Sequence, residues 1–131
     1  MPITFSCQDA DDFITVKYAG KITGDDLIAA WKAFLEDEKF TPGNNYFIDV
    51  SDADLSKLTG KGLHDYVAYL EQFIEAQGQG VTVRKSAIYA PDTLAYGIAR
   101  MYDALGINTA KSIRVFKEKQ DAINWLANNA S

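Results

Sequence analysis

Cysteine, histidine and long apolar runs are scarce in this sequence. Its 131 residues include one cysteine, Cys7, and one histidine, His64. A single cysteine excludes a disulfide within the chain and a thiolate metal cluster, and low cysteine usage fits a reducing compartment. No stretch approaches the ~20 consecutive apolar residues that cross a bilayer, and residues 1–10 lack the pattern of a secretory signal. We therefore expect a soluble, cytoplasmic protein without a membrane span.

Positive charge is also in deficit. The net charge is −5, which argues against nonspecific binding of nucleic acid or anionic membranes. Residues 1–75 carry 14 acidic and 6 basic side chains, whereas residues 76–131 carry 4 and 7. Such polarity would orient a protein partner or favour head-to-tail contacts. The simpler interpretation is that these charges occupy solvated helix faces.

No linker, repeat or low-complexity tract divides the chain, so residues 1–131 are expected to form a single domain. Alternating or continuous apolar patterns predict strands at 3–5, 14–18, 46–50, 86–90 and 112–116. Thr23 and Asp26 resemble a capping box at the start of the first of four helices. The resulting order ββαβαβαβα predicts an α/β fold, in which a mostly parallel sheet with an N-terminal β-hairpin is flanked by helices.

Helical spacing of apolar residues predicts which face of each helix is buried. In the second helix, Leu63, Val67, Leu70 and Phe73 share one face. In the third helix, which begins at Pro91 and Asp92, we expect the inward residues to be Leu94, Ile98, Met101, Tyr102 and Leu105.

Motifs for catalysis are missing. His64 has no recognisable nucleophile motif, and Gly62-Leu63 after Gly60-Lys61 breaks the phosphate-loop pattern. Asp49, Asp52 and Asp54 lack regular metal-ligand spacing, and a strand-end Asp49 that caps the next turn is the simpler interpretation. We predict no enzyme activity, catalytic residue, metal or cofactor. The start of the second helix nevertheless suits a bound anion or a phosphorylated Thr59, although an ordinary helix start is simpler.

Tyrosines are the best sequence hint of a small-molecule site. Their rings are apolar and their hydroxyls can orient a ligand. Half-covering the core is the commoner role of such residues. The candidates are Tyr66, Tyr89, Tyr96 and Tyr102, with Tyr69 beside them on the second helix.

Short motifs along the chain resemble SpoIIAA-like proteins, relatives of the STAS domains of anti-sigma-factor antagonists. Ile113–Phe116 followed by Ala122, Trp125 and Leu126 resembles the family's last strand and short final helix. Residues 16–23 look like its strand-Gly-x-Ile-Thr segment, and residues 47–51 look like its central strand ending in Asp. The resemblance implies a STAS/SpoIIAA-like fold and a non-enzymatic regulatory module that binds a protein partner.

In STAS antagonists an Asp-Ser-Ser-Gly turn carries the phosphorylated serine of a switch. The counterpart here is Lys57-Leu58-Thr59-Gly60, in which the Asp and the first Ser are missing. Thr59 as a plain helix cap fits equally well. The candidate residues for partner binding or a phosphoswitch are Asp49, Ser51, Ser56, Thr59, Gly60 and His64.

The layout also resembles that of lipid-carrying CRAL-TRIO domains. This implies an alternative function, the carriage or sensing of a small apolar, lipid-like molecule in a pocket between sheet and helices. A homodimer is a further expectation, with Phe40 or Trp125 as exposed aromatics at its interface.

Overall fold

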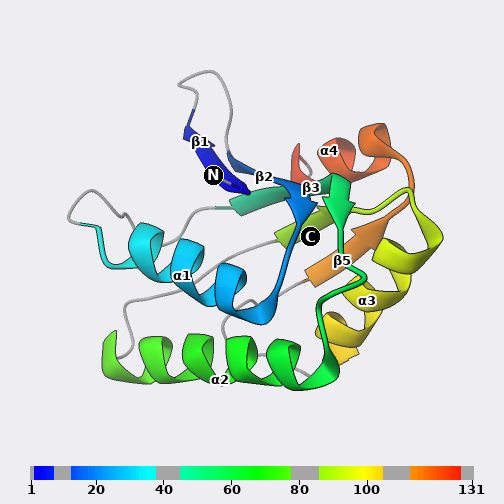
Figure 1. Cartoon of the computed structure of the whole chain (residues 1–131). Helices are drawn as coiled ribbons and strands as arrows, with labels where there is room; N and C mark the ends of the chain where they lie inside the picture. The colour runs from blue at the N-terminus through cyan, green and yellow to red at the C-terminus, as the bar shows by residue number, and fades with distance from the viewer. Residues whose placement is uncertain (1, 8–12, 38–44, 78–85, 105–112, 128–131) are drawn as a thin grey trace.

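Strands and helices follow one another in the predicted order ββαβαβαβα (Figure 1). The computed structural model describes residues 2–7, 13–37, 45–77, 86–104 and 113–127, with the backbone alone for residues 7, 74–77 and 102–104. The described elements are β1 (Ile3–Cys7), β2 (Phe13–Lys21), α1 (Gly24–Leu35), β3 (Asn45–Asp54), α2 (Gly60–Gln77), β4 (Ser86–Tyr89), α3 (Thr93–Ala104), β5 (Ile113–Phe116) and α4 (Lys119–Ala127).

The strands form one mixed sheet in the order β1-β2-β3-β4-β5. β1 pairs antiparallel with β2, and the other neighbouring pairs are parallel. An antiparallel pair needs only a short connection, whereas each parallel pair needs a longer crossover, which a helix provides. The predicted hairpin and mostly parallel sheet are thus confirmed.

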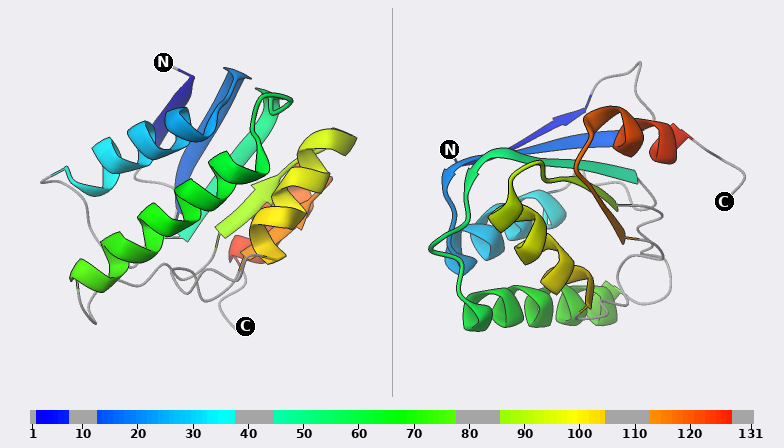
Figure 2. Two further views of the ribbon diagram at one scale, coloured as in Figure 1. Left: turned by 60° about the horizontal axis from the view of Figure 1, so that its bottom comes forward. Right: turned by 90° about the vertical axis from the view of Figure 1, so that its right-hand side faces the viewer.

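Both faces of the sheet are covered. α1, α2 and α3 lie on one face and α4 lies on the other (Figure 2). Along β3, Tyr46, Ile48 and Val50 belong to the larger core under α1, α2 and α3, while Phe47 belongs to a smaller cluster under α4. This two-sided burial explains why residues 46–50 are almost all apolar. Within the described residues, no helix is long and apolar enough to cross a membrane.

An aromatic cluster fixes α1 against the β1–β3 part of the sheet. Phe5 and Phe34 stack with ring centroids 4.2 Å apart, and Trp31 meets Phe5 edge-on at 5.0 Å. The Trp31 Nε1 donates a hydrogen bond of 2.9 Å to the Tyr18 hydroxyl in the core. A buried indole needs such an acceptor, so this bond fixes the orientation of Trp31 as well as satisfying it.

Two local predictions are wrong. β3 continues to Asp54 instead of ending near Val50, because residues 52–54 pair with residues 19–21 of β2. On α3, Leu94 and Met101 are 50% and 53% exposed, whereas the sequence prediction placed them inward. The residues of α3 that pack against the sheet are the small Ala95 and Ala99, with Ile98 partly buried beside them. Leu105 and the side chain of Tyr102 lie outside the described part.

Candidate functional site

The start of α2 is capped by Thr59. The Gly62 amide donates a hydrogen bond of 2.9 Å to Thr59 Oγ1, and the Leu63 amide donates to the Thr59 carbonyl at 3.0 Å. Thr59 and Gly60 are exposed, and the first turn of α2 contains no acidic residue. The geometry is therefore that of a threonine helix cap at the protein surface, with the positive end of the helix dipole not balanced by its own first turn.

Two glycines bring the start of α2 against the start of α1. A Cβ atom on Gly24 would lie 2.6 Å from Gly62 Cα and 2.8 Å from the Gly62 carbonyl oxygen. A Cβ atom on Gly62 would lie 3.3 Å from Gly24 Cα and equally close to Thr59 Oγ1. The backbones of the two helices are thus in direct contact, and only glycine fits at position 24 without displacement. Gly62, which breaks the phosphate-loop pattern, is explained by this contact.

The segment before α2 contains the same local structure twice. Asp49 Oδ1 accepts hydrogen bonds from the Ser51 amide at 2.9 Å and the Ser51 hydroxyl at 2.6 Å. Asp54 Oδ1 accepts from the Ser56 amide at 3.0 Å and the Ser56 hydroxyl at 2.6 Å. The first pair lies where β3 has one residue more than β2 between paired positions, and so it supports a bulge. The Asp-x-Ser spacing was the available sequence signal for both pairs.

These pairs distinguish the candidate phosphorylation sites. The hydrogen bonds from Ser56 lower the pKa of the Asp54 carboxyl, which keeps that group ionised. A phosphate on Ser51 or Ser56 would replace a donated hydrogen bond with repulsion from a carboxylate. A phosphate on Thr59 would instead lie at the amino end of a helix, where negative charge is stabilised. Thr59 is therefore the best acceptor of the three by geometry.

Charged side chains near this segment form separate pairs and not one cluster. Lys17 Nζ lies 3.0 Å from Asp52 Oδ2, and the Asp52 hydrogen bond raises the pKa of Lys17. Lys61 and Asp65 form an exposed pair at 2.8 Å within α2, and His64 between them is exposed. Asp49 and Asp54 each bond a serine, as described above. Across the described residues, no group of three or more His, Cys, Asp or Glu is placed to hold a metal ion.

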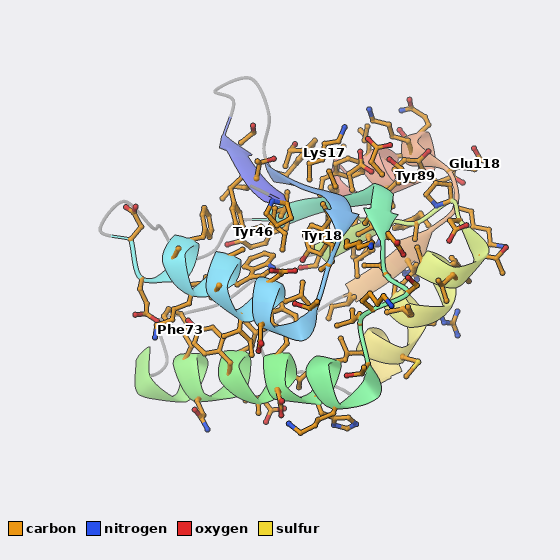
Figure 3. The ribbon with its side chains drawn as sticks, in the orientation of Figure 1. Lys17, Tyr18, Tyr46, Phe73, Tyr89 and Glu118 are labelled. Carbon is orange, nitrogen blue, oxygen red and sulfur yellow. The ribbon has the colours of Figure 1, made fainter. Side chains whose placement is uncertain are left out.

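The predicted tyrosine group is not brought together. Tyr66 is buried in the larger core. Tyr89, which is labelled in Figure 3, packs with Phe47 in the cluster under α4. Tyr96 is partly buried and lies under the Lys117 ammonium, which is 4.9 Å from its ring centroid. The Tyr102 side chain lies outside the described part. Of the four candidates, the structure puts Tyr66 alone at a cavity, where it is joined by Tyr18, which the sequence analysis missed.

This apolar cavity lies between the sheet and the helices α1, α2 and α3. Its volume is about 50 Å³ and it is partly open to solvent. Apart from two tyrosines, its lining residues are aliphatic, so it favours an apolar occupant over water. The lining residues are Tyr18, Leu27, Ile48, Val50, Leu55, Leu58, Leu63, Tyr66, Ile88, Ile98 and Ala99.

Two aromatic residues, Trp125 and Phe40, were proposed for a dimer interface, and the structure describes one of them. Trp125 is partly buried, with its ring centroid 5.8 Å from that of Phe116, and the Arg114 guanidinium lies over it at 5.7 Å. Trp125 thus packs within its own chain. Phe40 lies outside the described residues.

Comparisons with known proteins address the fold. No protein-family model matches the chain, and no curated protein matches it. Among solved structures, an uncharacterised protein of the DUF3478 family from Shewanella loihica PV-4, with a SpoIIAA-like fold, matches with a TM-score of 0.55 and 21% sequence identity. The match covers 95% of this chain and 91% of that protein. Together with the sheet order and its antiparallel edge, this similarity identifies the fold of the chain as SpoIIAA-like, of the STAS type, as the sequence resemblance predicted.

Proposed function

We propose that the protein is a non-enzymatic regulatory module of the cytoplasm that binds a protein partner through the start of α2. The contact area, which we call the α2-start surface, consists of Ser56, Thr59, Gly60 and His64, all of which are exposed. The observation that carries the proposal is Thr59 at an exposed helix start whose first turn has no acidic residue. Asp49 and Ser51, the remaining candidates from the sequence, are hydrogen-bonded to each other within β3.

Phosphorylation of Thr59 is the proposed means of regulation. The phosphate would lie close to backbone amides of α2, and the charge of the helix end favours it. The same oxygen, Thr59 Oγ1, now accepts the Gly62 amide, so the modification changes the group presented to a partner without removing the helix start. Binding would respond to the added charge and bulk at this point.

The test is partner binding by a double variant. Protein purified from its own host, with whatever partners it retains, identifies the partner and shows by peptide mass spectrometry whether Thr59, Ser56 or Ser51 carries a phosphate. The purified partner is then titrated into the wild type and into Thr59→Glu with His64→Ala. We expect the double variant to bind at least about tenfold more weakly or more tightly. Thr4→Glu with Gln120→Ala, both exposed and on other elements, is the matched control. Equal binding by all three proteins would refute the proposal.

The apolar cavity favours a second candidate, the carriage or sensing of a small apolar molecule. Its volume of about 50 Å³ is well below the ~300–1,000 Å³ of pockets for drug-sized ligands, so a lipid would need the cavity to widen. This function predicts a ligand mass in the native mass spectrum that disappears on denaturation. It also predicts a lower melting temperature after the ligand is stripped. An unchanged melting temperature would count against the carrier.

A further inference from the structure

We draw no further inference here: the strongest candidate, the apolar cavity between the sheet and the helices α1, α2 and α3 with the exposed Leu94 and Met101 of α3, carries none because nothing in the structure shows what fills or covers it.

Discussion

α1 and α2 begin side by side with the same type of cap, but their first turns differ. Thr23 Oγ1 accepts from the Asp26 amide at 3.2 Å, and Asp26 Oδ2 accepts from the Thr23 amide at 2.9 Å. This confirms the predicted capping box and makes a closed, reciprocal structure. Thr59 makes one such side-chain bond, and no carboxylate returns it. At the start of α1 the cap and the first turn hydrogen-bond to each other. The start of α2 lacks this reciprocal bond and leaves its polar groups facing outward.

The first turns of α1 and α2 also differ in charge. Asp25 and Asp26 place two carboxylates in the first turn of α1, where they stabilise the positive end of the dipole. The first turn of α2 has Lys61 instead. An added anion is thus repelled at the start of α1 and stabilised at the start of α2. The sequence alone distinguishes the two helix starts, because Gly-Asp-Asp follows Thr23 and Gly-Lys-Gly follows Thr59.

The largest expected effect comes from the contact that joins the two helix starts. In Gly24→Ala the new Cβ would lie 2.6 Å from Gly62 Cα, so one helix must move. We expect a loss of about 1–3 kcal/mol in the free energy of unfolding, measured by urea denaturation. Gly97→Ala in α3 is the control, because its Cβ meets nothing within 4 Å, and we expect a gain of about 0.5–1 kcal/mol. Equal stability of both variants would show that the helices do not touch as described.

Removing each cap tests the difference directly. Thr23→Ala loses both halves of a partly buried capping box, so we expect it to cost about 1–2 kcal/mol. Thr59→Ala loses one exposed hydrogen bond and should cost about 0.5–1 kcal/mol. Thermal unfolding of both variants with the wild type gives the comparison. A larger loss for Thr59→Ala would reverse our reading of which start is structural.

Charge substitution at the two caps is expected to change stability differently at α1 and α2, by a smaller amount than cap removal. Thr59→Glu loses the cap, but its carboxylate faces a helix end that lacks an acidic first turn, which returns about 0.3–1 kcal/mol. Thr23→Glu adds a third carboxylate beside Asp25 and Asp26 and gains nothing in return. Urea midpoints at low and high salt measure both effects. If salt reduces the difference in urea midpoint between the two variants, electrostatics causes that difference. An unchanged difference would point to sterics.

The smallest effect concerns the other end of the α1–α2 pair. The Tyr69 hydroxyl donates a hydrogen bond of 3.0 Å to Glu36 Oε2, and burial followed by this bond raises the pKa of Tyr69 from 10.0 to about 12. The folded state thus holds the phenol proton more tightly than the unfolded chain. Its contribution is full below pH 10 and is lost as the pH rises through about 12. Tyr69→Phe should show a shallower loss of stability between these values, and absorbance titration should lack one late-ionising tyrosine.

The sequence predicted the order of elements because alternating and helical apolar patterns decide it. It failed on α3 and at the end of β3, where the apolar pattern alone does not decide the arrangement. On α3, Ala95 and Ala99 face the sheet and leave the larger Leu94 and Met101 outside, a choice that periodicity does not determine. β3 extends through polar residues because backbone pairing with β2, not burial, holds them.

The candidate site was predicted less completely than the fold. Thr59 was placed at a helix start from the neighbouring glycines. The structure shows it as a helix cap, which was one of the two interpretations of this residue. The tyrosine group failed because Tyr66 lies on α2, which covers one face of the sheet, whereas the Tyr89 side chain of β4 packs in the cluster on the other face, and this arrangement follows only from the topology. The cavity could not be predicted from the sequence, because its lining comes from all three core helices and from β2, β3 and β4.

The contact between Gly24 and Gly62 also provides a criterion for finding related chains. Because no side chain separates the two backbones, each glycine depends on the other rather than on its own local conformation. In a distant homologue that keeps these helix starts in contact, the position of Gly24 must remain glycine, whereas a Cβ at the position of Gly62 requires its neighbours to shift by a few tenths of an ångström. A homologue with a larger residue at the position of Gly24 must hold α2 farther from α1, and so must present a different α2-start surface. After structural superposition, this pair of positions would therefore sort homologues by the geometry of their two helix starts.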